Sequence, residues 1–253
     1  MTSIFDSSEF NGNLFFPRPD LKPVPPTAMD LFVPASEQVK LHVRRYPDEG
    51  AQFILLYFHG NGEIASDYDD LAEVFASLNA ELIVAEYRGY GKSDGRPTLR
   101  SALEDSHLIY QYLVQEGYLK RKCCVMGRSL GSAAAIELCS KHSEISACVV
   151  ESGYADPIPL VERRGLRIDK TTDEENALFN NSYKIAGVHC PTLIMHGEDD
   201  FLISSQEAEE NFRCVGTKEK TLEILEGVGH NDMMMAHEGA YFKALNNFFS
   251  TYL

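Results

Sequence analysis

The chain has 253 residues, which is enough for one substantial core and short for two ordinary domains. Hydrophobic residues make up 44% of it and charged residues 24%, proportions that are ordinary for a globular protein. The formal net charge of -15 disfavours non-specific binding to nucleic acid or to an anionic membrane surface.

The N-terminal thirty residues are rich in proline, and we predict that they form an extended lead-in. The first ten residues contain neither a basic region nor an apolar stretch, so we expect no secretory signal. The six cysteines are scattered, mostly within apolar runs, and no two of them form a C-x-x-C pair. We therefore expect buried, reduced thiols and a cytoplasmic protein.

Residues 39–44 alternate apolar and polar side chains, which predicts an early antiparallel strand with one solvated face. Short continuous apolar runs follow, as is typical of parallel strands buried on both faces: residues 53–58, 82–87, 123–126, 147–150, 192–195 and 221–225. Segments with helical spacing lie among them: residues 66–78, 101–113, 129–139, a segment opened by a capping box of Ser204 and Glu207, and residues 237–253. This alternation predicts an α/β fold, a mostly parallel central sheet with helices on both faces, in one domain.

A candidate nucleophile follows the run at residues 123–126. In an α/β fold the active site lies beyond the carboxyl ends of the strands. There the chain reads Gly127-Arg128-Ser129-Leu130-Gly131, followed by the small residues of a predicted helix. This G-x-S-x-G pattern predicts a sharp turn that projects the Ser129 hydroxyl, with room only for glycine two residues before and after it. The alternative is a glycine-rich turn without function.

Serine needs a base beside it at neutral pH, and the sequence contains eight histidines. His230 is the candidate base because it directly follows the run at residues 221–225 and comes last, in the order serine, acid, histidine. Five other histidines are set aside: His42, His107 and His142 lie in strand or helix patterns, His237 at a predicted helix start and His189 in a loop without a motif.

The acid is expected between Ser129 and His230, after a strand. Asp199 and Asp200 both follow the run at residues 192–195 and are both candidates, and Asp156, after residues 147–150, is a more distant alternative. These acids could instead favour only the N-terminus of the following helix.

An oxyanion hole is predicted from the loop His59-Gly60-Asn61-Gly62-Glu63, which follows the strongest apolar run. A tetrahedral intermediate carries a negative oxygen that needs preorganised donors. We expect one N–H from Leu130, the residue after the nucleophile, and another from this loop at Asn61. Without the nucleophile motif the loop would be only a glycine turn.

Together these motifs resemble the α/β-hydrolase superfamily, over nearly the whole chain from about Val39. The matching segments are residues 59–62, 87–93, 127–132, His196-Gly197 with Asp200, and residues 229–232. The combination is similar to the small-cap group that includes the protein depalmitoylases of eukaryotes and bacterial relatives. Leu202 and Ile203 follow Asp200 at the spacing of this family's loops, so the resemblance favours Asp200 over Asp199.

The resemblance implies hydrolysis of a carboxylic ester or thioester through an acyl-enzyme intermediate on Ser129, His230 and Asp200. It implies no metal and no organic cofactor. Depalmitoylases of this group usually carry a lipidated or apolar N-terminal anchor; this sequence starts without either, so we expect no stable membrane anchor and a small-molecule or acyl-ester substrate.

The resemblance also places a small cap at residues 153–187. This segment contains a basic cluster, Arg163, Arg164 and Arg167, which could hold an anionic substrate group or could be a solvated helical face paired with local acids. Met233–Met235 could line an acyl pocket or belong to the core.

Three functions are compatible with these residues. The leading hypothesis is an ester or thioester hydrolase; the alternatives are a peptidase or acyltransferase with the same triad, and a non-catalytic binding protein on the same fold. A haloalkane dehalogenase or epoxide hydrolase would need aspartate in place of Ser129. The sequence predicts no oligomeric state.

Overall fold

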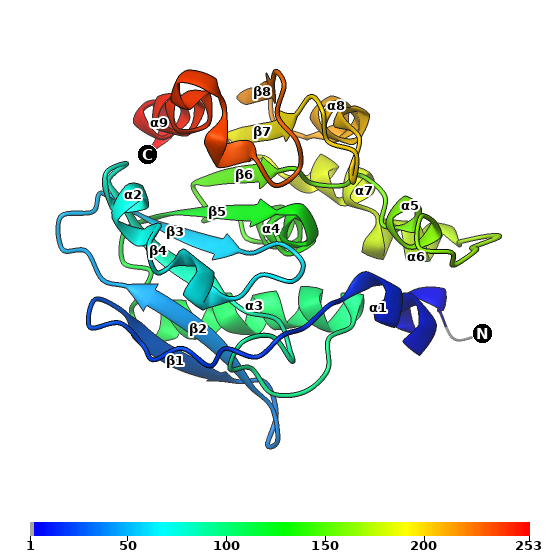
Figure 1. Cartoon of the computed structure of the whole chain (residues 1–253), viewed down its shortest axis with the longest axis horizontal. Helices are drawn as coiled ribbons and strands as arrows, with labels where there is room; N and C mark the ends of the chain where they lie inside the picture. Colours follow the sequence, from blue (N-terminus) through cyan, green and yellow to red (C-terminus); the bar gives the residue numbers. More distant parts are fainter. Residues whose placement is uncertain (1–2) are drawn as a thin grey trace.

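Eight strands form one sheet in the order β1-β2-β4-β3-β5-β6-β7-β8 (Figure 1). The computed structural model describes residues 3–253. Strands β3 to β8 are parallel, and β2 pairs antiparallel with β1 and β4. The predicted mostly parallel sheet and its antiparallel start are therefore confirmed. The solvated face expected for residues 39–44 is wrong, because His42 and Arg44 of β2 are buried and paired with carboxylates. The strands are β1 Met29–Pro34, β2 Lys40–Tyr46, β3 Phe53–Phe58, β4 Ala80–Ala85, β5 Lys122–Arg128, β6 Ala147–Glu151, β7 Thr192–Gly197 and β8 Lys220–Leu225.

The central strands are buried on both faces, as their continuous apolar runs predict. Every residue of β3, β4, β6 and β7 is buried. β8 differs, because its first five residues are half-buried or exposed. The prediction of a doubly buried strand at residues 221–225 was wrong, since β8 is the last strand of the sheet and has a neighbour on one side only.

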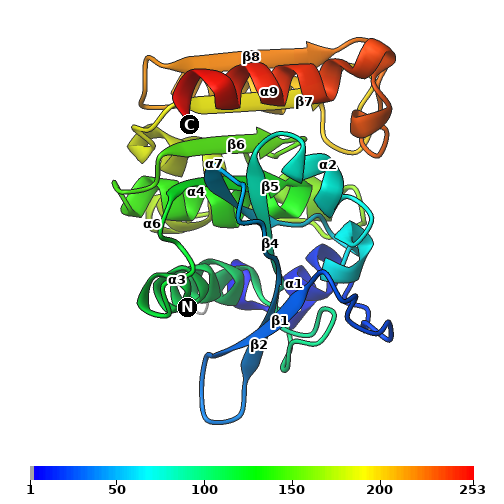
Figure 2. The ribbon, with the colours of Figure 1, turned by 90° about the vertical axis from the view of Figure 1, so that its left-hand side faces the viewer.

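Helices cover both faces of the sheet and enclose a separate hydrophobic core on each. Alternate residues of β3 point into the two cores, with Leu56 in one and Leu55 in the other. One core is closed by α3, α4 and α8, and the other by α2 and α9, which lies along the β7–β8 end of the sheet (Figure 2). The helices are α1 Ser8–Leu14, α2 Ala72–Ala76, α3 Leu99–Gln115, α4 Ser132–Lys141, α5 Ile158–Glu162, α6 Asp173–Phe179, α7 Asn181–Lys184, α8 Ser205–Cys214 and α9 Ala240–Tyr252. None of the helices in residues 3–253 is both long and apolar enough to cross a membrane.

One predicted helix is split. Instead of a continuous helix over residues 66–78, the chain forms a 3-10 turn at Ala65–Tyr68 and then α2. The Tyr46 hydroxyl donates to the carbonyl of Ala65 at 3.1 Å and to the Asp69 carboxylate at 2.7 Å. Because Arg44 also pairs with Asp69, the chain between the two pieces is held against β2.

The capping box predicted at Ser204 is only half formed. The Ser204 hydroxyl caps α8, but the Glu207 carboxylate turns away and accepts the backbone N–H groups of Ala155 and Asp156, at 2.7 and 3.2 Å. A tertiary contact thus replaces the local one. The last helix begins three residues later than predicted, because a 3-10 turn at His237–Gly239 ends in Gly239 at φ 67°.

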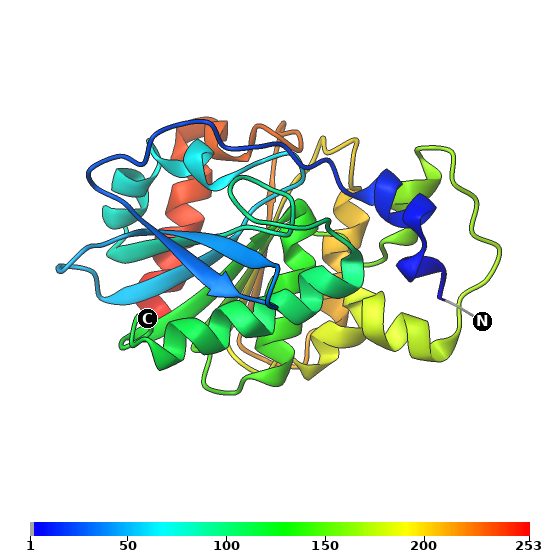
Figure 3. The same cartoon turned by 90° about the horizontal axis from the view of Figure 1, so that it is seen from below.

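The largest difference from prediction is at the N-terminus, which is helical at residues 4–14. A 3-10 turn at Ile4–Asp6 is followed by α1, whose N-terminus is capped by the Ser7 hydroxyl. Phe5 is buried and stacks on Phe179 of α6, with ring centroids 4.5 Å apart. Figure 3 shows α1 beside α5 and α6 and away from β1, the strand that follows it in the sequence. We call residues 3–20 the N-terminal arm.

The segment at residues 153–187 lies between β6 and β7 and contains α5, α6 and α7. We call it the cap segment. Its helices are short, with four to seven residues each, and its role as a cap stays a prediction. All six cysteines are free, and four of them are buried.

Candidate active site

Ser129 lies on a sharp turn between β5 and α4. Its φ is 52°, in the left-handed region that a residue with a side chain rarely adopts. A Cβ on Gly127 would lie 2.2 Å from the carbonyl oxygen of Gly131, and one on Gly131 would lie 2.0 Å from that of Phe58. The predicted crowding of these two glycines is confirmed. The turn thus depends on glycine at both positions and projects the serine beyond the strand end.

His230 connects Ser129 to Asp200. Its Nε2 lies 3.0 Å from the Ser129 Oγ, and its Nδ1 lies 2.6 Å from the Asp200 Oδ2. An ionised carboxylate only accepts hydrogen bonds, so Nδ1–H donates to Asp200 and Nε2 is left to accept the serine hydroxyl proton. The structure therefore brings together the three residues proposed from the sequence as nucleophile, base and acid.

The Asp200 carboxylate is buried and saturated with donors. Its Oδ1 accepts the backbone N–H groups of Leu202 and Ile203, both at 2.8 Å, and its Oδ2 also lies 3.1 Å from Nε2 of His196. Burial alone would raise the pKa of Asp200, but hydrogen bonds from His196, His230 and the Ile203 amide outweigh it and hold the pKa well below its usual range. Asp200 is thus kept ionised beside the imidazole.

The alternative acids lie elsewhere. Asp199 is exposed. Asp156 caps the turn before α5 through the Ile158 N–H at 2.9 Å, and burial with nearby Glu207 raises its pKa. Only Asp200 contacts His230 among these candidates.

Leu130 and Asn61 line the same pocket as Ser129. The Asn61 side chain contacts the N-terminal arm and Tyr90: one Nδ2 N–H donates to the Leu14 carbonyl at 2.6 Å, and Oδ1 accepts the Phe16 N–H at 2.9 Å and the Tyr90 hydroxyl at 2.5 Å. Because these contacts engage the side chain, the backbone N–H of Asn61 is the simpler candidate for an oxyanion donor. The side chain instead fixes the arm over the pocket.

A buried ionic network behind the pocket was not predicted. Arg128, the residue before the nucleophile, pairs with Glu63 and, at 3.2 Å, with Glu151. Its Nη2 donates to the His230 carbonyl at 2.9 Å and to the Asn231 side chain at 3.0 Å. Burial raises the pKa of Glu151. The network ties the loop that carries the histidine to the strand that carries the serine, and both Arg128 and Glu63 stand inside motifs that could have indicated it.

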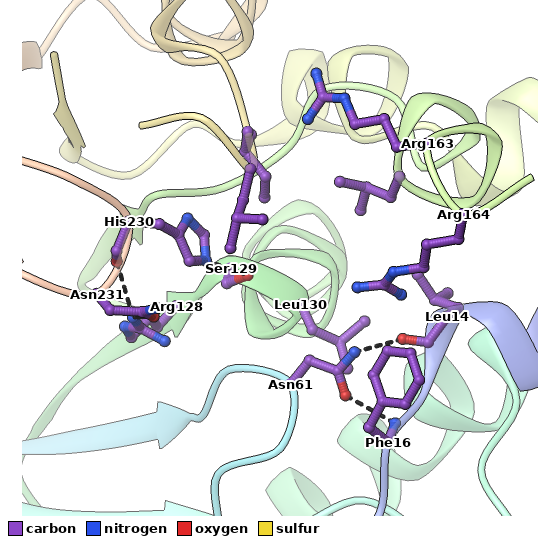
Figure 4. Close-up of a pocket in the computed structure, with 13 residues that line it drawn as sticks. Leu14, Phe16, Asn61, Arg128, Ser129, Leu130, Arg163, Arg164, His230 and Asn231 are labelled. Carbon is purple, nitrogen blue, oxygen red and sulfur yellow. Dashed lines mark hydrogen bonds between the residues drawn. The ribbon is translucent and has the colours of Figure 1, made fainter. Parts of the chain in front are cut away.

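The pocket in front of Ser129 has a volume of about 350 Å³ (Figure 4). Its lining comes from six parts of the chain: the N-terminal arm, the loop after β3, the turn at Ser129, the cap segment, and the loops after β7 and β8. The apolar lining residues are Leu14, Phe16, Leu130, Leu160, Leu202 and Ile203. Arg163 and Arg164 of the cap segment also line it.

Two other predicted specificity elements lie outside this pocket. Met233 is buried in the core that α9 closes, and Met235 is 83% exposed, so the methionine run belongs to the core and surface rather than to the acyl pocket. Arg167 faces a separate hollow on the outer side of the cap segment.

Comparison with known proteins finds hydrolases. Residues 50–171 match a family described as Serine aminopeptidase, S33. The chain is 31% identical over 201 residues to protein bem46 of Schizosaccharomyces pombe, covering 77% of this chain and 66% of that protein. It is 29% identical over 207 residues to the alpha/beta hydrolase domain-containing protein aho-3 of Caenorhabditis elegans, covering 80% and 59%. The human alpha/beta hydrolase domain-containing protein 17B is 28% identical over 211 residues, covering 79% and 67%. The chain thus spans about three fifths to two thirds of the length of these curated relatives.

Solved structures with the same fold include the Pyrococcus furiosus esterase Pf2001, with a TM-score of 0.76 and 19% identity over 93% of this chain and 98% of that one. The monoacylglycerol lipase of Paleococcus ferrophilus has a TM-score of 0.64 and 18% identity, covering 83% and 98%. At these identities the likeness concerns the fold, and it agrees with the predicted fold class.

Proposed function

The chain belongs to the α/β-hydrolase superfamily, and we propose that it is a serine hydrolase that cleaves a carboxylic ester or thioester through an acyl-enzyme intermediate. The observation that carries the proposal is the hydrogen-bonded chain from Ser129 through His230 to Asp200, which opens into a pocket with apolar walls. Apolar walls suit an acyl chain, and a nucleophile–base–acid chain suits acyl transfer.

In the proposed first step, His230 accepts the Ser129 proton on Nε2 while Oγ attacks the carbonyl carbon of the substrate. The backbone N–H groups of Leu130 and Asn61 would stabilise the oxyanion of the tetrahedral intermediate. His230 then gives its proton to the departing alcohol or thiol. Asp200, held ionised by its donors, keeps the imidazole in the required tautomer and stabilises its charged form.

In the second step, His230 removes a proton from the water that attacks the acyl-serine ester, and then returns this proton to the Ser129 oxygen as the acid is released. Arg128 supports both steps as a positioning residue, because its Nη2 donates a hydrogen bond to the backbone carbonyl of His230. The strained turn at Ser129 keeps the nucleophile exposed to the pocket without a rotamer change.

The test is hydrolysis of 4-nitrophenyl butyrate by purified protein. We expect Ser129→Ala to lower kcat/KM by at least about 10³-fold while the thermal unfolding midpoint changes little. Ser140→Ala is the matched control, because Ser140 lies on α4 and its hydroxyl donates only to the Glu137 carbonyl of the same helix. Equal activity in the wild type and the Ser129→Ala variant would contradict the proposal.

A second set of substrates separates hydrolysis from the peptidase and acyltransferase alternatives. The proposal predicts that an aminoacyl 4-nitroanilide is a far poorer substrate than the ester. It also predicts that an added amine or alcohol diverts little of the acyl group from water. Faster cleavage of the anilide, or dominant transfer to the added acceptor, would replace the proposed reaction with one of these.

A further inference from the structure

The charge of the pocket is opposite to that of the chain. The chain has 38 acidic and 23 basic residues, so its surface as a whole repels anions. Among the described residues that line the pocket, however, three are arginines and none is Asp or Glu. The arginines are Arg128, Arg163 and Arg164. The pocket that contains Ser129 is therefore locally basic in an acidic chain.

The three arginines differ in their partners. Arg128 forms ion pairs with Glu63 and Glu151, so these carboxylates neutralise its charge and it offers no unpaired charge to a ligand. Arg163 and Arg164 have no carboxylate within 4.0 Å anywhere in residues 3–253. Both residues are exposed, as the interpretation as a solvated face expects, but the pairing with local acids that it also expects is wrong.

Arg164 is held in place without being neutralised. One of its terminal nitrogens donates to the Asn13 carbonyl of the N-terminal arm, and its guanidinium lies 4.5 Å from the centre of the Phe16 ring. Figure 4 shows the guanidinium reaching from the cap segment into the pocket, beside Leu14 and Leu130. A guanidinium has five N–H donors, so most of them are left for a ligand. Arg164 is exposed as a whole residue, but partial burial of its guanidinium lowers its pKa, and no acidic partner offsets this.

Arg163 adds a second positive charge at the rim of the same pocket (Figure 4). It is exposed, and its guanidinium points away from Ser129 in Figure 4, so it must turn to reach a ligand that Arg164 holds. Two guanidinium groups above an apolar floor form a site for a planar or tetrahedral oxyanion at the end of an apolar chain.

We propose that this pocket selects esters that carry an anionic group, a carboxylate or a phosphate-type group, remote from the scissile bond, with Arg164 and Arg163 binding that group. The inference rests on the proposed ester hydrolysis and specifies its substrate class. The reaction is unchanged: water cleaves the acyl–oxygen bond, and the remote anion is neither made nor consumed.

Matched esters test the proposal on the acyl side. Mono-4-nitrophenyl adipate ends in a carboxylate, whereas methyl 4-nitrophenyl adipate has the same chain with the charge masked, and 4-nitrophenyl 5-phosphonopentanoate carries a phosphonate. We expect kcat/KM for at least one anionic ester to exceed that for the masked ester by about tenfold, through KM. The preference should decline with added salt, because the charges are partly exposed.

The same comparison applies to the alcohol side, with 4-carboxyphenyl hexanoate and its neutral 4-carbamoylphenyl analogue. A preference on either side supports the proposal and shows which part of the substrate carries the anion. Equal kcat/KM for charged and neutral esters on both sides, in a protein that needs Ser129 for hydrolysis, overturns the proposal and leaves the proposed function intact.

Variants assign the preference to the arginines. Arg164→Gln and Arg163→Gln should each lower the ratio of anionic to neutral kcat/KM by about three- to tenfold, and Arg164→Lys should retain part of it. Arg167→Gln is the control, because it removes the same charge from the same segment outside the pocket. An unchanged ratio in Arg164→Gln and Arg163→Gln contradicts the assignment.

A binding measurement decides the inference even if no ester is hydrolysed. Calorimetric titration of the Ser129→Ala variant should show about tenfold tighter binding of mono-4-nitrophenyl adipate than of its methyl ester, and loss of the difference when Arg164→Gln is added. Equal affinities overturn the inference. Absence of turnover with a clear difference in affinity instead contradicts the proposed function alone.

Discussion

Two regions meet at the pocket, and they are built by different means. Ser129, Asp200 and His230 each follow a parallel strand by at most five residues, so the hydrogen-bonded sheet determines their positions. The cover of the pocket, made of the N-terminal arm and the cap segment, consists of short helices joined by side-chain contacts. The proposed catalytic residues are thus positioned by the hydrogen bonds of the whole sheet. The proposed selectivity residues, Arg163 and Arg164, are positioned by a few separate side-chain contacts. Substitutions should therefore have different consequences in the two regions.

The largest expected effect tests the scaffold side at the acid. Asp200→Asn should lower kcat/KM for a 4-nitrophenyl ester by about 10³- to 10⁴-fold, because an amide favours the wrong imidazole tautomer. Asp199→Asn, one residue away and exposed, should change kcat/KM by less than about threefold. Steady-state kinetics of both variants measures the contrast. Similar losses in the two variants would contradict the assignment of the acid to Asp200.

A smaller effect is expected in the cover. Phe16→Ala removes an apolar wall of the pocket and the aromatic partner of Arg164. We expect kcat/KM for a 4-nitrophenyl hexanoate to fall about fivefold, with little change for the acetate, because the longer chain loses apolar contact. Leu21→Ala is the control, since Leu21 is 89% exposed and outside the pocket. An equal loss for both esters would mean that the arm supports the nucleophile itself, which would remove the contrast between the two regions.

The smallest effect concerns the stability of the scaffold, at Glu137 on α4. Burial alone would raise the pKa of Glu137, but a hydrogen bond from His107 and the positive charge of Lys184 at 3.2 Å outweigh it and lower the pKa from 4.5 to about 2. A carboxyl group with a lowered native pKa stabilises the fold above its unfolded pKa, and this contribution disappears as the pH falls from about 4.5 to about 2.

Glu137→Gln should therefore lower the free energy of unfolding by about 1–2 kcal/mol at pH 7, and the difference from the wild type should shrink toward pH 2. Urea unfolding at several pH values measures it. A difference that is independent of pH would show that the side chain acts through packing alone. Glu137 pairs with Lys184 of the cap segment, but neither residue lines the pocket, so the variant should leave the preference between esters unchanged.

The contrast between the regions also explains which features could be predicted from the sequence. The turn at Ser129 requires Gly127 and Gly131 for local steric reasons, so its motif is sufficient to identify it. The N-terminal arm was missed because its order depends on distant partners: the Leu99 N–H donates to Asn11 at 2.8 Å, and Arg100 pairs with Asp6 at 2.7 Å. A helix of seven residues shows too little periodicity to be read without those contacts.

The same reasoning applies to the other errors. Glu207 stands at the spacing of a capping box, but the amides of the cap segment compete for its carboxylate. The apolar run of β8 does not reveal that its strand lies at the edge of the sheet. In both cases the local sequence pattern is present. The structure differs from the prediction because of a tertiary contact of Glu207 in the first case, and because β8 lacks a second neighbouring strand in the other.

The central claim is that Ser129 is a nucleophile activated by His230, and labelling with a fluorophosphonate probe tests it most directly. The account predicts a single adduct, located by mass spectrometry on the peptide that contains Ser129, absent from Ser129→Ala and strongly slowed in His230→Gln. No adduct on the folded wild-type protein, or an adduct at another serine that persists in Ser129→Ala, would contradict it.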